Sequence, residues 1–248
     1  MGLRRAFFTR EADRVMASER LVLAGDPAVE VLLKPSARSR RMSLRVSRLD
    51  GRVTLSLPVG LPRGEAQGFL DEKADWIRGH LAEVPGEARP MPGGTILFEG
   101  RPHRIEAAAQ RGITVRDGVL VVPASRVETT PARLAAFLKT MARDRLVASS
   151  QRYADAIGRD LGRVTLRDTR SRWGSCTHEG DLMYSWRLIM APPSVLDYVA
   201  AHEVAHMIHM DHSDRFWGVV AELCPNHKAE RRWLKQRGGE LHRYRFRD

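Results

Sequence analysis

Hydrophobic and polar residues alternate over short stretches in the first half of the chain. This alternation predicts strands, and the stretches cover residues 29–33, 42–46, 53–57, 95–98, 103–107, 113–116 and 119–122. Asp50-Gly51 and Asp117-Gly118 each lie between two neighbouring stretches, and both dipeptides favour hairpin turns. Between the two groups of strands, apolar residues at helical spacing predict a helix over residues 64–82.

The second half of the chain has mainly helical spacing. Residues 131–158 predict a long amphipathic helix, ended by Gly158 or Gly162. Further elements follow in turn, with strands at 164–168 and 182–186 and helices that start near Pro193, after Ser213 and at Lys228. Ser194 and Asp197 match a capping box at the first of these later helices.

These patterns predict an α+β protein with its functional candidates on the C-terminal helices. A β-rich N-terminal part with one helix is expected at 26–125 and a second domain at 126–248, preceded by an N-terminal extension over 1–25. The Pro- and Gly-rich stretch 84–95 is interpreted as a connector. No internal repeat is visible.

The helix that starts near Pro193 carries a dense group of histidines in AHEVAHMIHMDH, residues 201–212. His202 and His206 are one turn apart, about 6 Å along the axis, so both imidazoles can reach one ion at roughly 2 Å. Glu203 lies about 100° around the helix, where it can reach a water beside that ion but cannot complete a compact ligand set. This is the HExxH arrangement of two zinc ligands and a carboxylate base. The alternative is a pair of buried histidines whose nitrogens bond to backbone carbonyls.

A third ligand has two candidates in the same stretch. His209 lies about 10 Å further along the axis than His202 and cannot share the ion. His212 can share it if the helix ends near 210–211 and the chain turns back, with Ser213 capping the next helix. We therefore predict one Zn²⁺ per chain, held by three histidines, which leaves a coordination position open for catalysis.

Several stretches taken together resemble a known family. They are TRSRWGSCTHEGDLMYSWRLIMAPPSVLDYVAAHEVAHMIHMDHSDRFW, CPNHKAERRWLK, and GRVTLSLPVGLP with ADWIRGHL. In order and spacing they are similar to the YgjP-like family of predicted zinc metallopeptidases. The resemblance implies a zincin-like metallopeptidase domain of the minigluzincin type over 126–248, distantly similar to SprT-like proteases that act on DNA-associated proteins. It also implies that His202, His206 and His212 are the ligands and Glu203 the base.

The RWGSC stretch allows more than one interpretation. Trp173 and Trp186 could contact substrate beside the metal helix, but packing of that helix against the sheet is the favoured role. Cys176 is expected to be a buried inert thiol, with a fourth zinc ligand as the alternative.

The leading functional interpretation is a zinc peptidase acting on a protein or peptide substrate. Zinc would lower the pKa of its water, and Glu203 would accept the proton before attack on the peptide carbonyl. Arg172, Arg187 and His209 are all candidates for stabilising the oxyanion. Hydrolysis of a non-peptide amide uses the same groups and stays open.

Charge introduces a competing class of function. Lys and Arg outnumber Asp and Glu by 41 to 30, a net charge of +11, with clusters at Arg38, Arg40 and Arg41 and in the C-terminal tail. Such clusters serve solubility or contact nucleic acid, so the alternative is a zinc-stabilised nucleic-acid-associated protein. The two cysteines are too few for a disulfide framework, and no stretch approaches the roughly 20 apolar residues of a membrane span. A cytoplasmic protein without a membrane partner is expected.

Overall fold

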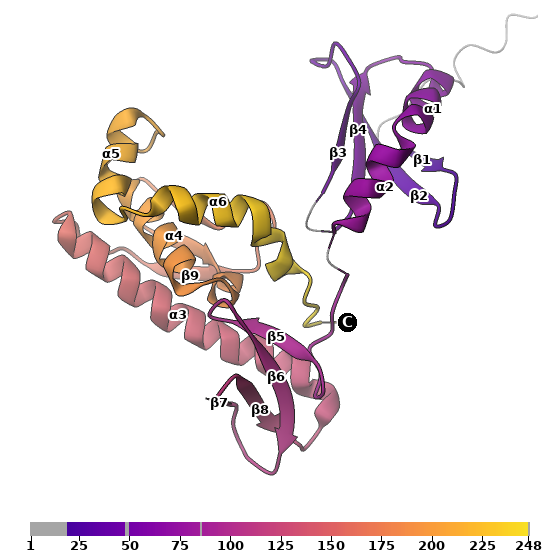
Figure 1. The fold of residues 1–248 in the computed structure, drawn as a ribbon. Helices are drawn as coiled ribbons and strands as arrows, with labels where there is room; N and C mark the ends of the chain where they lie inside the picture. The colour runs from indigo at the N-terminus through magenta and orange to yellow at the C-terminus, as the bar shows by residue number, and fades with distance from the viewer. Residues whose placement is uncertain (1–18, 48–49, 85, 248) are drawn as a thin grey trace, which may run out of the picture. The chain divides into compact units, whose positions relative to one another are not determined.

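The computed structural model describes residues 19–47, 50–84 and 86–247. Helices and small sheets are mixed along the chain, which confirms the predicted α+β class (Figure 1). The chain divides into two compact units, Met1–Pro85 and Gly86–Asp248, and each has its own hydrophobic core. No helix in the described ranges combines the length and apolarity needed to cross a bilayer.

The N-terminal unit is a four-stranded sheet covered on one face by two helices. Its elements are β1 (Arg20–Leu23), β2 (Val29–Ser36), β3 (Ser43–Val46), β4 (Val53–Pro58), α1 (Arg63–Glu72) and α2 (Ala74–Ala82). The strand order is β1-β2-β4-β3, in which only β2 and β4 are parallel. Alternate residues such as Val31 and Leu55 point inward and pack with Leu70 and Ile77 of the helices.

Two expectations for this unit differ from the structure. The helix predicted over 64–82 is interrupted at Lys73, which ends α1 and precedes α2. The N-terminal extension predicted over 1–25 includes β1, because Leu21 and Leu23 belong to the sheet's core. The remainder of that extension, residues 1–18, lies outside the described residues.

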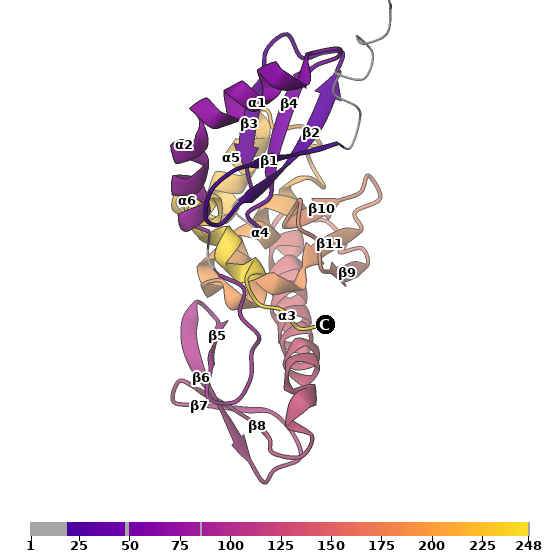
Figure 2. The same ribbon diagram turned by 90° about the vertical axis from the view of Figure 1, so that its right-hand side faces the viewer.

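The C-terminal unit contains two sheets and the helices that carry the histidines. Its strands are β5 (Thr95–Phe98), β6 (Arg101–Ala108), β7 (Thr114–Arg116), β8 (Val119–Pro123), β9 (Val164–Arg167), β10 (Gly174–Cys176) and β11 (Leu182–Ser185). Its α-helices are α3 (Thr130–Ala156), α4 (Pro193–Ala205), α5 (Asp214–Leu223) and α6 (His227–Arg237). The sheet orders are β5-β6-β8-β7 and β10-β11-β9, and α3 runs past both sheets (Figure 2).

The division between units falls at 85/86, whereas the sequence suggested a domain boundary at 125/126. The sheet β5–β8 belongs with the helices that follow it, because Ile105 and Leu120 share one core with Leu134 and Leu138 of α3. A small sheet must bury its apolar face against another element, and α3 provides that element here. The connector predicted at 84–95 spans the division.

The two four-stranded sheets have the same topology, although no repeat is visible in the sequence. In each, an antiparallel hairpin (β1-β2 or β5-β6) is followed by a second one (β3-β4 or β7-β8), and the last strand of the second pairs in parallel with the last strand of the first. Gly51 and Gly118 sit at equivalent turns with φ of 66° and 78°, a left-handed conformation that favours glycine. The two sheets therefore share one topology although their amino-acid sequences show no repeat.

Helix α4, which carries the predicted histidines, is fixed to α3 by a half-buried polar contact. The Asp197 carboxylate accepts hydrogen bonds from Ser149 (2.7 Å), Arg152 and Tyr153. The predicted capping box between Ser194 and Asp197 does not form, because α4 begins at Pro193 with Pro192 as its N-cap, which places Ser194 inside the helix. The contact thus anchors the N-terminal half of α4, five residues before His202.

Candidate metal centre

The helix that carries the histidines ends earlier than predicted. α4 stops at Ala205 with His206 as its C-cap, not near 210–211. His206 Nδ1 donates a hydrogen bond to the carbonyl of His209 at 2.9 Å. In a continuous helix that carbonyl would point away from the preceding turn, so this bond requires the chain to leave the helix.

The turn after α4 brings the chain back toward the helix. The Ser213 backbone N–H donates to Asp211 Oδ1 at 3.2 Å, which closes the turn. Ser213 occupies the predicted N-cap position of α5 with extended backbone angles, but its side chain makes no capping bond. The Asp211 side chain therefore closes the turn, and the capping bond predicted for Ser213 does not form.

The returning chain places three imidazoles around one point. His202, His206 and His212 each offer a ligand atom, and these atoms lie within 4.8 Å of one another. The Nε2 atoms of His202 and His212 are 3.3 Å apart. Two nitrogens bound to a tetrahedral zinc at about 2.0–2.1 Å are separated by about 3.3 Å. The His202–His212 pair therefore has the spacing that zinc requires, and the ligand atom of His206 lies within 4.8 Å of both.

Two of the histidines, His202 and His206, also favour the neutral form that can bind a cation. Burial, reinforced by His206 and His212, lowers the pKa of His202 to about 3, and burial lowers the pKa of His206 as well. Neutral imidazole is the form that binds metal. Because His206 Nδ1 carries the proton given to a carbonyl, its Nε2 keeps a free lone pair, an arrangement common among metal-binding histidines. The donor set is therefore suited to Zn²⁺.

Glu203 is buried beside the cluster, on the side of α4 that faces β10. Its side chain occupies the space where a Cβ of Gly174 would lie, since that atom would be 2.5 Å from Glu203 Oε1. Burial raises the pKa of Glu203 to about 8, and the charge of Arg172 partly opposes this rise. A carboxyl held this way takes up a proton readily, whereas a bound cation would lower its pKa.

The role of Gly174 was missed in the sequence. Its only signal there is its place in RWGSC, and nothing local links it to a glutamate on a later helix. Glycine lets the β10 backbone approach the carboxylate, as any larger residue would occupy the same volume.

Aromatic side chains of α5 form one wall of the cluster, which the sequence also left unassigned. Phe216 stacks on His206 with centroids 4.4 Å apart and lies 5.0 and 4.8 Å from His202 and His212. Trp217 lies 5.7 and 5.9 Å from the same two rings. This wall holds the imidazoles in place and limits water on that side.

Helix α6 supports the wall from behind. His227, buried in α6, stacks on Trp217 with centroids 6.0 Å apart. The Arg231 guanidinium lies 4.6 Å from the centre of the same indole, within cation–π range. His227 is therefore a packing residue and is separated from the imidazole cluster by Trp217.

Arg187 has a structural role that removes it from the oxyanion candidates. Its Nε donates to Asp168 Oδ1 at 2.6 Å, and its Nη1 donates to the carbonyls of Leu241 (2.9 Å) and Tyr244 (3.1 Å). The side chain is buried, so these bonds hold the C-terminal segment against the core. Arg172, which acts electrostatically on Glu203, lies closer to the chemistry.

The remaining predicted residues pack rather than bind. Trp186 is 2% exposed and meets Phe246 edge to face, and Trp173 packs on His242 with centroids 5.1 Å apart. Cys176 is half-buried, not buried as predicted, and lies outside the group of ligand atoms formed by the three histidines. Burial, with a further contribution from the Glu203 charge, raises the pKa of its thiol to about 11, away from the thiolate form that binds zinc.

A family model described as YgjP-like, metallopeptidase domain matches residues 40–237. The chain belongs to this family. The match spans most of the chain and includes Glu203 and the three clustered histidines, so the resemblance inferred from RWGSC and HExxH is confirmed at the level of the YgjP-like family. Searches of curated proteins and of solved structures gave no significant match.

Proposed function

We propose that this YgjP-like protein is a zinc-dependent peptidase with one Zn²⁺ per chain, held by His202, His206 and His212. The observation that carries the proposal is the 3.3 Å separation of two Nε2 atoms beside the buried carboxylate of Glu203. Membership of a metallopeptidase family supports the same reaction class. Three protein ligands are typical of catalytic zinc sites, whereas structural sites use four.

When bound, zinc supplies a Lewis acid that lowers the pKa of water and polarises a carbonyl group. The protein must then move one proton. Glu203 takes it from the attacking water at a carboxylate oxygen, and the water's oxygen forms a bond to the peptide carbonyl carbon. Glu203 returns the proton to the amide nitrogen as the C–N bond breaks, which leaves a carboxylic acid and an amine; the acid's proton then passes to the amine, giving carboxylate and ammonium. Burial favours this role because it makes the carboxylate more basic.

The edge strand β10 supports an extended polypeptide as the substrate. It lies at the edge of its sheet. The Trp173 carbonyl accepts a bond from Ser185 of β11 (2.8 Å), and the Thr177 N–H donates to the carbonyl of Asp181, just before β11 (2.9 Å). Antiparallel pairing alternates, so the peptide groups of Gly174 and Cys176 point toward the free edge. A substrate strand pairing there would pass beside Glu203, whose side chain lies against Gly174.

The test is hydrolysis of an unstructured protein such as casein by the zinc-loaded full chain. We expect mass spectrometry to show fragments whose paired masses exceed the parent by one water. A chelator should stop cleavage, and zinc but not magnesium should restore it. Hydrolysis of small non-peptide amides with no cleavage of any polypeptide would instead support the alternative substrate class.

A further inference from the structure

The N-terminal unit carries a group of cations with no acidic residue among them. Residues 31–47 contain five basic and no acidic side chains. These side chains are all exposed, and we call them the basic cluster: Lys34, Arg38, Arg40, Arg41 and Arg45.

The basic cluster differs from every other described cation of its unit. The others are ion-paired or bonded to carbonyls: Arg20 to Glu30, Arg52 to Asp50, Arg63 to Glu19, Lys73 to Glu72, and Arg78 to the carbonyls of Ala24 and Pro27. Within the residues that the structure describes, no side chain of the basic cluster has an ion-pair partner. Its charge is thus available to an external anion.

Two members of the cluster lie on the sheet face opposite the hydrophobic core. Lys34 in β2 is paired with Ser56 of β4, and Arg45 in β3 is paired with Thr54 of β4. Because side chains alternate along a strand, these residues point away from the buried face that α1 and α2 cover. Cations therefore flank a central strand that carries short hydroxyl side chains.

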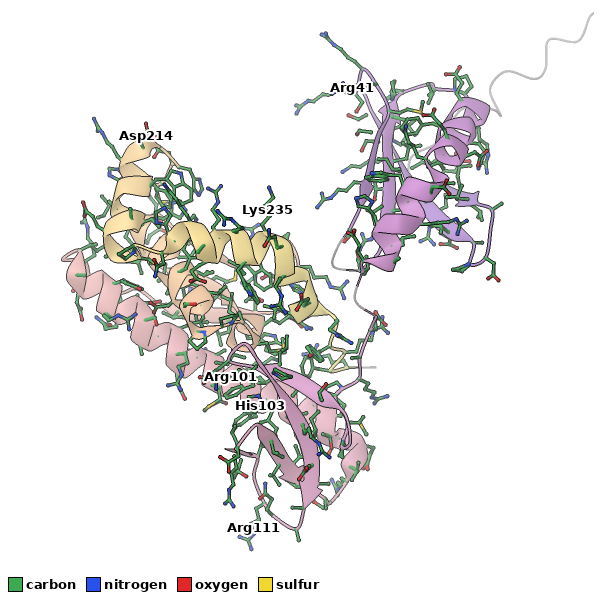
Figure 3. All side chains as sticks on the ribbon, in the orientation of Figure 1. Arg41, Arg101, His103, Arg111, Asp214 and Lys235 are labelled. Atoms are coloured by element: carbon green, nitrogen blue, oxygen red, sulfur yellow. The ribbon has the colours of Figure 1, made fainter. Side chains whose placement is uncertain are left out.

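The other members extend this surface at one end of the sheet. Arg38, Arg40 and Arg41 lie in the connection between β2 and β3, next to the carboxyl end of β4, because Ser36 and Pro58 are paired. Figure 3 labels Arg41 at this tip of the unit, where nitrogen-ended side chains project outward. The sheet face and the loop thus form one continuous basic surface.

The opposite face of the unit has the opposite charge. Residues 63–83, which contain α1 and α2, carry three basic and five acidic side chains, 3 − 5 = −2. Residues 31–47 carry +5 by the same count. A charge separation of this kind orients a polyanion toward the sheet face during encounter.

We propose that the basic cluster binds the phosphate backbone of double-stranded nucleic acid without sequence preference. Guanidinium groups bind phosphate oxygens in pairs of hydrogen bonds, and the hydroxyls of Thr54 and Ser56 are the short donors that commonly accompany them. Neither residues 31–47 nor β4 contain an aromatic side chain, so the surface lacks the stacking platform that single strands use. This inference goes beyond the peptidase function and does not depend on it.

The experiment measures binding of the full chain to a short duplex of mixed sequence as salt is varied. Five phosphate contacts predict a slope of about −4.5 for log association constant against log salt. In Arg38→Ala/Arg40→Ala/Arg41→Ala we expect a slope of about −1.8 and affinity at low salt reduced at least about tenfold. Removing zinc with a chelator should leave binding unchanged, which separates this result from the fate of the peptidase proposal.

A matched control removes the same charge from the sheet of equal topology in the C-terminal unit. Arg101→Ala/Arg111→Ala/Arg116→Ala changes three exposed arginines in or beside β6 and β7, of which Figure 3 labels Arg101 and Arg111. We expect the salt slope of this control to match that of the unmodified protein. Equal losses of slope in both variants would mean that total charge, not the basic cluster, determines binding.

Further outcomes would overturn the proposal. These are an unchanged slope in the Arg38/Arg40/Arg41 variant, tighter binding to single strands, and binding to vesicles of anionic phospholipid without binding to the duplex, which would assign the surface to a membrane. If the triple variant does not fold, Lys34→Gln with Arg45→Gln tests the same surface, with an expected slope of about −2.7.

Discussion

The two four-stranded sheets share one topology but differ in what covers them. The N-terminal sheet is closed by its own helices α1 and α2, and its core is separate from the other unit's. The sheet β5–β8 packs instead on α3, and its core is continuous with that of α4, the helix that presents His202. Topology alone therefore does not place the chemistry. The candidate site lies where a sheet, the long helix α3 and the histidine-bearing helix α4 share one hydrophobic core.

The largest effect should come from cutting the chain on either side of the second sheet. A fragment that starts at residue 86 should fold and bind zinc, since it keeps the whole C-terminal core. A fragment that starts at residue 123 loses core residues Ile96, Ile105, Leu120 and Val122. At about 1.5–3 kcal/mol each, their burial contributes roughly as much as a domain's entire stability.

Circular dichroism and metal analysis of the two fragments check this expectation. If the shorter fragment folds and holds zinc like the full chain, the second sheet is as independent as the first. The shared core would then contribute little to the site.

Next in size is the contrast among histidines within the C-terminal unit. His212→Ala should remove zinc, because it deletes one of three ligand nitrogens. His209→Ala should retain most zinc, because His209 holds His206 through its backbone carbonyl, which the substitution leaves in place. Metal analysis after dialysis gives the answer. If His209→Ala loses zinc and His212→Ala keeps it, His212 is not the third ligand.

A smaller effect is expected when two glycines with different surroundings are each replaced by alanine. Gly174→Ala places a Cβ 2.5 Å from Glu203 Oε1, whereas Gly218→Ala in α5 meets no atom within 4 Å. Displacement of a catalytic group by about 1 Å can cost roughly 10²-fold in rate, so Gly174→Ala should lose about that much activity and keep its zinc. Gly218→Ala should keep both. Equal activities in steady-state assays would remove the positioning role of Gly174.

The smallest effect on the candidate site is expected from a substitution that creates a cavity in the N-terminal core. Leu55→Ala removes a fully buried side chain and should lower the free energy of unfolding of that unit by about 2–5 kcal/mol. Zinc content should not change, because the two cores are separate. Reduced zinc affinity in this variant, measured by titration with a competing chelator, would show that the units are coupled.

Local patterns predicted the elements better than their grouping. β4 at Val53–Pro58 and α3 at Thr130–Ala156 lie within a residue or two of their predicted limits, since periodicity is a property of neighbouring residues. The boundary at 85/86 was missed because it depends on which sheet α3 covers. That choice is made by residues far apart in the chain, so periodicity does not reveal it.

The candidate site likewise has parts that the sequence predicted and parts that it did not. The proximity of His202 and His206 follows from helix geometry alone. The approach of His212 follows the end of the helix at Ala205, which comes earlier than its composition suggests and is accompanied by the bond from His206 to the His209 carbonyl. Gly174 could not be linked to Glu203 from the sequence, because the two meet only when β10 packs on α4.

The most direct test measures zinc content and peptidase rate in one preparation of Glu203→Gln. Glutamine nearly matches glutamate in size but cannot take the proton from the attacking water. We expect one zinc per chain and a rate reduced by about 10²–10⁴ relative to the unmodified protein. An undiminished rate with full zinc would contradict the role of Glu203 as the base.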